Sequence, residues 1–324
     1  MPTYQSKNTG GTPTTRASEL LTAALAHADA DVDKAASNTS TSSRGSLRAI
    51  LHEAHALVTG TEPYLEQNTS DLIVPSAHPV ARVQVHAAWN DLLEVTQRTD
   101  WVALKDEGKT RFELGAGMCS GPYEAVVLQN LALLQRTRSV LEIGTFTGTA
   151  TLAFALLPSV EKVVALDIEP YLAELVTPYW QRAGTAQKID FKIAPALESL
   201  ADLSKQQHAP FDLVFIDADK PSYKAYVQAV LDGGLLSENG VILADNTMYK
   251  GFPWATPGAH EQQATTGATV AEDDFAQGNR TNNRSKSEAT TGIADFNTYV
   301  REHSDLETVM LPIRDGITII RRKL

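Results

Sequence analysis

Residues 139–148, SVLEIGTFTG, combine a short apolar run with a glycine-containing turn. Further apolar runs follow, and stretches long enough for helices separate them. Runs that are apolar throughout indicate strands covered on both faces, and their alternation with helices indicates a parallel sheet built from β-α-β units. We predict an α/β fold with a doubly wound sheet, with strands at 139–143, 162–167, 189–193, 211–217 and 240–245.

The end of the chain, residues 306–322, contains two more strand-like runs on either side of Asp315 and Gly316. An Asp-Gly dipeptide favours a tight reversal between antiparallel strands. We therefore expect the sheet to end in an antiparallel C-terminal hairpin.

The first 100 residues differ from this domain in composition. Two segments rich in Ser, Thr, Asn and Gly predict a flexible tail and a linker, and three segments with helical apolar spacing predict accessory helices. The tail and linker are 1–16 and 34–46, and the helices are 17–30, 47–60 and 80–97. We assign 1–100 to an N-terminal helical extension and 101–324 to the main domain, with 253–291 as a long lid or a disordered insertion.

Charge and composition exclude several classes of protein. The 324 residues include 28 Lys and Arg against 39 Asp and Glu, a net charge of −11, and so acidic a chain repels a nucleic-acid backbone. Cys119 is the one cysteine, so no intrachain disulfide can form. No run of about 18 apolar residues occurs, and residues 1–16 lack the apolar run of a signal peptide. We expect a cytoplasmic protein that binds neither nucleic acid nor a membrane.

The turn after the first strand is a candidate cofactor site. Glu142 precedes Gly144, Gly148 follows four residues later, and Asp167 ends the next strand. Glycines at such a turn allow a ligand to approach the backbone, and a strand-end carboxylate can accept hydrogen bonds from ribose hydroxyls. The glycine spacing is not Gly-x-Gly-x-x-Gly, which argues against a dinucleotide. The alternative is a plain strand-to-helix turn with one capping acid.

Oxygen-bearing side chains end the next two strands of the pattern. Asp217 follows 211–216, and Asp245 and Asn246 follow 241–244. Because the carboxyl ends of parallel strands meet at one edge, we expect these residues to converge. Oxygen donors without His or Cys suit Mg²⁺, Mn²⁺ or Ca²⁺. The alternative is that Asp and Asn end strands because they favour turns.

Two further features belong to this edge. Lys220 lies three residues after Asp217, and a cation beside it would lower the pKa of its ammonium and allow it to act as a base; the alternative is a solvated surface lysine. Tyr249, Phe252 and Trp254 follow Asn246 and are candidates for the wall of a flat substrate site, with ordinary packing as the alternative.

Several motifs together resemble those of a known family. They are MCSGPYEAVVL (118–128), VLEIGTFTG (140–148), ALDI (165–168), FDLVFIDADKPSY (211–223), ADNTMYKG (244–251) and LPIRDGITIIRR (311–322). In this order they resemble the cation-dependent O-methyltransferases of the caffeoyl-CoA and catechol type, over residues 100–324. The segments 59–70, 99–101 and 107–121 resemble more narrowly a microbial branch that includes the O-methyltransferases of mycosporine (4-deoxygadusol) biosynthesis.

The resemblance implies S-adenosylmethionine bound on a Rossmann-like seven-stranded sheet, and a homodimer. It implies that Asp217, Asp245 and Asn246 bind a divalent cation, that Lys220 and Asp217 act in catalysis, and that Tyr223 lies near the substrate, to which we add Tyr249 and Trp254. The residues assigned to the cofactor are Met118, Ser120, Glu142, Gly144, Thr145, Gly148, Asp167, Ile168, Ala196, Asp217 and Asp219. The chain departs from the pattern at Ala150, at Glu124–Ala125 and in the length of 253–291.

The function we predict from these residues is the methylation of a hydroxyl on a small vicinal diol, catechol or enol in secondary metabolism, dependent on S-adenosylmethionine and a divalent cation. Two alternatives remain open at this point. One is an NAD(P)-dependent oxidoreductase on a similar sheet, which gives no role to Asp245 and Asn246. The other is a non-catalytic regulator that binds cofactor, against which the retained ligands and Lys220 argue.

Overall fold

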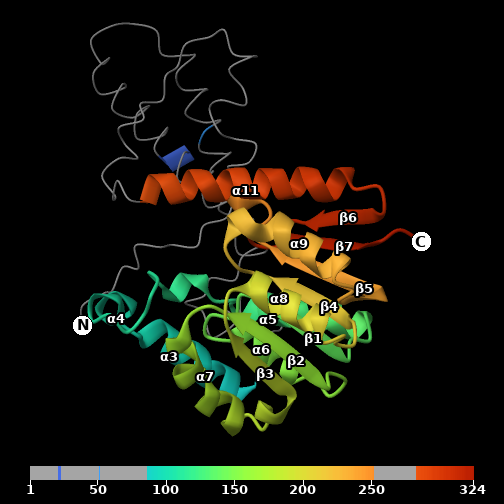
Figure 1. Cartoon of the computed structure of the whole chain (residues 1–324). Helices are drawn as coiled ribbons and strands as arrows, with labels where there is room; N and C mark the ends of the chain where they lie inside the picture. Colours follow the sequence, from blue (N-terminus) through green and yellow to red (C-terminus); the bar gives the residue numbers. More distant parts are fainter. Residues whose placement is uncertain (1–20, 23–50, 52–85, 252–281) are drawn as a thin grey trace, which may run out of the picture.

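The computed structural model describes residues 21–22, 51, 86–251 and 282–324, which include a seven-stranded sheet with helices on both faces (Figure 1). The strand order is β3-β2-β1-β4-β5-β7-β6. Strands β1 to β5 are mutually parallel, and β7 is antiparallel to β5 and β6. The predicted Rossmann-like sheet is confirmed. The strands are β1 Ser139–Ile143, β2 Lys162–Asp167, β3 Ile189–Ile193, β4 Phe211–Ile216, β5 Leu236–Asp245, β6 Leu306–Leu311 and β7 Ile317–Arg322.

Helices follow the parallel strands in the predicted alternation. The described α-helices are α3 Ala87–Arg98, α4 Trp101–Asp106, α5 Pro122–Leu134, α6 Thr149–Ala155, α7 Pro170–Arg182, α8 Ala196–Lys205, α9 Tyr223–Asp232 and α11 Asn282–Glu302. Short 3₁₀ turns are η1 Ala116–Met118, η2 Ala186–Lys188, η3 Lys220–Ser222 and η4 Tyr249–Gly251. Proline begins α5 and α7, where its missing N–H needs no partner and its fixed φ suits the first turn.

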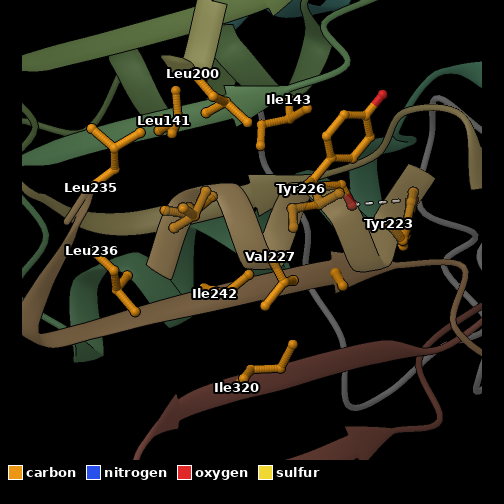
Figure 2. Close-up of a cluster of buried hydrophobic side chains, with 14 of the residues drawn as sticks. Leu141, Ile143, Leu200, Tyr223, Tyr226, Val227, Leu235, Leu236, Ile242 and Ile320 are labelled. Atoms are coloured by element: carbon orange, nitrogen blue, oxygen red, sulfur yellow. Dashed lines mark hydrogen bonds between the residues drawn. The ribbon is translucent and has the colours of Figure 1, made fainter. Parts of the chain in front are cut away.

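The core lies in two layers, because successive residues of a strand point to opposite faces. On one face, Leu141 and Ile143 of β1 pack with α8, α9 and α11. Figure 2 shows Val227 of α9 directed toward Ile242 of β5 in this layer. On the other face, Val140 of β1 packs with α5 and α6. Both faces of the parallel strands are therefore covered, as their continuous apolar sequences require.

The C-terminal hairpin differs from the predicted tight reversal at Asp315 and Gly316. Residues 312–316 form a longer connection between β6 and β7. The chain already turns at Ile313, whose N–H donates to the Leu311 carbonyl, and whose own carbonyl accepts from Gly316. The Asp-Gly pair ends the loop, with Gly316 at a φ of +91°. A side chain at Gly316 would collide with Met248, so close packing explains the glycine here.

Helix α11 corrects the predicted extent of the 253–291 insertion, because residues 282–291 are helical. Ala289, Ile293, Phe296 and Val300 recur three or four residues apart and are all buried. This spacing places one apolar face of the helix against α9 and β6. Composition alone did not reveal this apolar face, because the same segment contains many Ser, Thr and Asn residues. Residues 253–281 of the predicted insertion lie outside the described residues.

The N-terminal predictions are tested only in part. Helix α3 confirms the described part of the helix expected at 80–97. Its residues Trp89, Leu92 and Leu93 pack with Trp101 of α4 and with α7, so this part of the extension is joined to the main domain. The tail, the linker and nearly all of the two earlier helices lie outside the described residues. No helix in the described ranges is long and apolar enough to cross a membrane.

Candidate active site

A cavity of about 760 Å³ lies at the carboxyl ends of the parallel strands. The loops that follow β1, β2, β3, β4 and β5 all contribute to its wall, as do parts of 112–120 and the β6–β7 loop. Ligands of doubly wound sheets bind at this edge. The cavity brings together both clusters of polar residues that the sequence predicted.

Two glycines shape the turn after β1 for different reasons. Gly144 has a φ of +90°, and a Cβ there would lie 2.3 Å from the backbone carbonyl oxygen of Asp217. It therefore lets the β1 and β4 loops touch. Gly148 has a φ of +70°, and a Cβ there would meet the Trp180 ring at 2.5 Å. Gly148 thus packs beside α7, outside the wall of the cavity.

Asp167 holds this turn in place. Its Oδ2 accepts hydrogen bonds from the backbone N–H groups of Thr145 (3.0 Å) and Phe146 (2.8 Å), and its Oδ1 accepts from Glu169 (2.9 Å). Burial raises the pKa of Asp167, and these N–H donors oppose the shift. Asp167 also lines the cavity, where it has lone pairs left for a ligand.

Glu142 is fully buried at the edge of a small adjoining pocket, which Ser120, Gly144 and Thr145 also line. Its Oε2 accepts from the Thr151 hydroxyl, and its Oε1 has no partner among the described residues. Burial is the main cause that raises the pKa of Glu142 to about 8. Glu142 and Thr145 therefore lie next to the main cavity and outside its wall.

The other residues assigned to the cofactor line the main cavity: Met118, Ser120, Ile168, Ala196, Asp217 and Asp219. The position of the Asp219 side chain is fixed, because its carboxylate accepts hydrogen bonds from the hydroxyls of Tyr226 and Ser222. Tyr226 also lines the cavity, and the sequence analysis missed it. Asp219 precedes η3 and Tyr226 lies in α9, so their pairing depends on the turn between them and no helical spacing in the sequence predicts it.

Asp217, Asp245 and Asn246 all line the cavity at the ends of β4 and β5. Asp245 is 4% exposed, and its Oδ1 has no hydrogen-bond partner in the described part of the chain. Burial raises the pKa of Asp245 well above its ordinary value, and the nearby carboxylates of Glu124 and Asp217 raise it further. A buried, unpartnered carboxylate oxygen beside a second carboxylate fits a divalent cation.

A divalent cation at this position would need the Asn246 amide as its third ligand. No three His, Cys, Asp or Glu side chains within the described ranges are placed to hold a metal ion. Asn246 has a φ of +56°, in the left-handed region that is uncommon outside glycine and asparagine. Backbone outliers of this kind cluster at ligand sites.

Lys220 points its ammonium at the same cluster. Its Nζ donates to Asp217 Oδ1 at 2.9 Å and to the Tyr223 hydroxyl at 2.7 Å. Burial lowers the Lys220 pKa, but Asp217, Tyr223 and Asp245 raise it more, so the net shift is upward. The sequence analysis expected a lowered pKa beside a cation, whereas these neighbouring side chains have the opposite effect. The Lys220 side chain is nonetheless only 14% exposed and is paired within the site, so it is not a solvated surface lysine.

Tyr223 lies behind Lys220 and does not line the cavity. It is fully buried, its hydroxyl reaches the Ile216 carbonyl at 3.3 Å, and its ring meets Phe296 of α11 edge-on. Tyr223 therefore orients Lys220, and a direct substrate contact is not available to it here. Tyr249 does line the cavity. Trp254 and Phe252 lie outside the described residues.

Helix α11 packs against the loops that follow β4 and β5. A Cβ at Gly292 would lie 2.5 Å from Pro221 Cα, so the helix backbone packs directly on the turn that carries Lys220. Asn297 donates to the Thr247 carbonyl at 2.8 Å, immediately after Asn246. The sequence analysis assigned no role to either residue, because both contacts depend on how the helix docks.

Glu124 and Arg314 form an ion pair in the cavity wall, between α5 and the β6–β7 loop. The Glu124 side chain is 2% exposed and that of Arg314 is 20% exposed. The sequence analysis noted Glu124 only as a departure from the family pattern and missed Arg314. The two residues are 190 positions apart, so no local pattern predicts their pairing.

The sheet order and the site at its carboxyl edge define a Rossmann-like methyltransferase fold. The family described as O-methyltransferase matches residues 102–323, and the chain belongs to this family. It is an O-methyltransferase, and the predictions of family and enzyme class are confirmed. The narrower microbial branch stays a prediction.

The similar proteins agree with this assignment. The chain is 31% identical to a caffeoyl-CoA O-methyltransferase of Medicago sativa over 240 residues, which is 73% of this chain and 82% of that protein. It is 33% identical to caffeoyl-CoA O-methyltransferase 1 of Arabidopsis thaliana over 208 residues, covering 63% and 71% of the two chains.

Solved structures share the fold. The SAH-bound methyltransferase PaMTH1 of Podospora anserina superposes with a TM-score of 0.59 at 23% identity, over 80% of this chain and 98% of that chain. TomG of Streptomyces achromogenes, solved in complex with SAM, has a TM-score of 0.55 at 21% identity, over 79% and 97%. At these identities the likeness concerns the fold alone.

Proposed function

We propose that this protein transfers a methyl group from S-adenosylmethionine to a hydroxyl of a small acceptor with two adjacent oxygens, such as a vicinal diol, a catechol or an enol. A divalent cation, Mg²⁺, Mn²⁺ or Ca²⁺, belongs to the proposal, with Asp217, Asp245 and Asn246 as its ligands. The observation that carries it is the buried Asp245, with an unpartnered oxygen, in the same cavity as the Asp167 turn.

The two groups supply different chemistry. When bound, S-adenosylmethionine would supply an electrophilic methyl group and leave as the neutral S-adenosylhomocysteine, and the cation would supply Lewis acidity that favours the ionised acceptor. Support for this donor comes from PaMTH1 and TomG, which are described with SAH and SAM. Family membership argues against both the NAD(P)-dependent oxidoreductase and the non-catalytic regulator.

The chain's own residues bind, orient and handle the proton. The β1 turn, fixed by Asp167, would orient the methyl donor, and Asp219, fixed by Tyr226, lines the same cavity. The carboxylates of Asp217 and Asp245 raise the pKa of Lys220, and a cation bound to them would lower it again, so that Nζ could take the proton that leaves the acceptor hydroxyl. Tyr223 keeps Nζ beside Asp217. Positioning the two reactants in one cavity supplies much of the rate enhancement.

Three further predictions accompany this proposal: a homodimer, a place in secondary metabolism and a cytoplasmic location. They follow from the resemblance and the composition. Tyr249 is proposed as a substrate contact because it lines the cavity next to Asn246. The proposed role of Trp254 rests on its sequence position alone.

The test is a mass-spectrometric screen of catechols, vicinal diols and cyclic enols with S-adenosylmethionine, with and without a chelator. We expect a product heavier by one methylene unit that disappears in chelator and returns with added divalent cation. Product that persists undiminished in chelator would exclude the metal assignment. Failure to bind S-adenosylhomocysteine in calorimetry would exclude the donor assignment.

A further inference from the structure

Arg314 is a partly buried cation in the cavity wall, and neither the methyl donor nor the proposed metal gives it a role. It lies in the β6–β7 loop with a φ of +49°, in the left-handed region that a side chain with a Cβ seldom adopts. Such strained residues persist where the surrounding structure fixes them, and they concentrate at ligand sites. From this loop Arg314 lines the cavity.

The guanidinium is held on one side only. Its Nη1 donates to Glu124 Oε2, and within the described ranges no other side chain or carbonyl accepts a hydrogen bond from it. A guanidinium has five N–H donors in a rigid plane. None of its nitrogens is among the buried atoms that lack a partner, and Arg314 lines the cavity, so its remaining donors open onto that space.

The position of Arg314 relates it to the acceptor. Its charge acts on Asp245, a proposed cation ligand, without a direct hydrogen bond between the two side chains. An acceptor whose adjacent oxygens lie at Asp217, Asp245 and Asn246 would therefore present another substituent toward Arg314. The carboxylates of Glu124 and Asp245 would repel an anionic substituent if Arg314 were absent.

We propose that Arg314 is a specificity-determining residue that donates hydrogen bonds to an anionic oxygen of the acceptor, beyond the two oxygens at the cation. The preferred acceptor is then an oxyanion, either a carboxylate or an ionised enol. Planar donors of arginine match such groups and form charge-assisted hydrogen bonds. This inference rests on the proposed function and names the substrate class of the same site.

The test compares acceptors that differ in charge. One pair is 3,4-dihydroxybenzoate and its methyl ester, and the other is the acidic enol 2-hydroxycyclohexane-1,3-dione and catechol. We expect wild-type protein to prefer the anionic member by about 10- to 100-fold in kcat/KM, since a hydrogen bond to a charged group has this strength. Preference in the first pair alone identifies a carboxylate, and preference in the second alone identifies an enolate.

Arg314→Gly removes the guanidinium and suits the positive φ, so the loop is expected to fold. In this variant the ratio of kcat/KM for the anionic acceptor to kcat/KM for the neutral acceptor should fall to near one, mainly because the KM of the anionic acceptor rises. Glu124→Gln is the matched control, because it breaks the same ion pair and keeps the guanidinium. It should retain the ratio. A ratio that Arg314→Gly leaves unchanged, or that both variants lower equally, would overturn the inference and leave a purely structural ion pair.

Calorimetry of each acceptor with protein that contains divalent cation and S-adenosylhomocysteine separates the two proposals. Anion binding that Arg314→Gly abolishes, without methyl transfer by wild-type protein, would refute the proposed function and support the anion site. Methyl transfer with no dependence of the charge preference on Arg314 would refute the anion site and support the proposed function.

Discussion

Asp167 and Asp245 each end a strand and line the same cavity, but their carboxylates have opposite surroundings. Both oxygens of Asp167 accept hydrogen bonds from backbone N–H groups of the neighbouring turns. Asp245 is buried with an oxygen that has no partner among the described residues, and it lies near the carboxylates of Glu124 and Asp217. The Asp167 turn in the β1–β2 half of the site is therefore held by the protein itself, whereas Asp245 in the β4–β5 half keeps an oxygen, unpartnered among the described residues, that suits a positively charged ligand.

This difference separates two requirements of the proposed reaction. A methyl-donor site whose turn is fixed by backbone hydrogen bonds to Asp167 keeps its shape through binding and release, which favours positioning. Carboxylates that repel one another lower the stability of the protein when the cation site is empty. Because a bound cation relieves this repulsion, such a site binds the cation more strongly. Substitutions on the two sides should therefore have different signatures.

Asp245→Ala should produce the largest effect. Loss of the buried ligand should lower kcat at least ~100-fold, because a metal site that loses a donor no longer holds the ion in place. Binding of S-adenosylhomocysteine in calorimetry should survive, since Asp245 lies in the other half of the site. Asp202→Ala removes an exposed acid on α8 and serves as the control. Full activity of Asp245→Ala with divalent cation present would contradict the assignment.

Gly144→Ala tests the point where the two halves touch. The new Cβ would lie 2.3 Å from the Asp217 carbonyl oxygen at a positive φ, so the free energy of unfolding should fall by about 1–3 kcal/mol. The affinity for S-adenosylhomocysteine and the affinity for the divalent cation should fall together, because the β1 and β4 loops must separate. Gly115→Ala is the control, since a Cβ there meets nothing within 4 Å. Equal melting temperatures for the two variants would show that the contact is not important.

Much of this architecture could be predicted from the sequence, for a physical reason. Strands β1, β2 and β3 have the predicted bounds, because buried parallel strands are apolar throughout and end at polar residues. The convergence of Asp217, Asp245 and Asn246 followed from the rule that parallel strands share a carboxyl edge. Contacts that depend on docking could not be predicted. The Glu124–Arg314 pair, and Tyr223 buried beneath α11, require the three-dimensional structure.

Glu142 gives a pH test of the β1 side. Its pKa of about 8 in the folded protein exceeds the ordinary value of 4.5, so between these values the folded state holds a proton that the unfolded state releases. Stability should therefore fall as pH rises from about 5 to 8, and the loss should be complete above pH 8. Glu142→Gln lacks this titration. In the ligand-free protein, the melting temperature of the wild type should decline relative to that of Glu142→Gln as the pH rises from about 5 to 8. Melting temperatures that change with pH in the same way in both proteins would refute the raised pKa of Glu142.

Asn297→Ala should have the smallest effect and tests whether α11 braces the cation half alone. The variant loses one hydrogen bond to the Thr247 carbonyl, which should lower the free energy of unfolding by about 1 kcal/mol. Asn130→Ala is the matched control, because it removes an asparagine that bonds a carbonyl on the exposed surface of α5. Since Thr247 follows Asn246, Asn297→Ala should weaken Mn²⁺ binding in titration calorimetry and leave the affinity for S-adenosylhomocysteine unchanged. An equal loss of both affinities would mean that α11 stabilises the fold as a whole and that the two halves of the site are not independent.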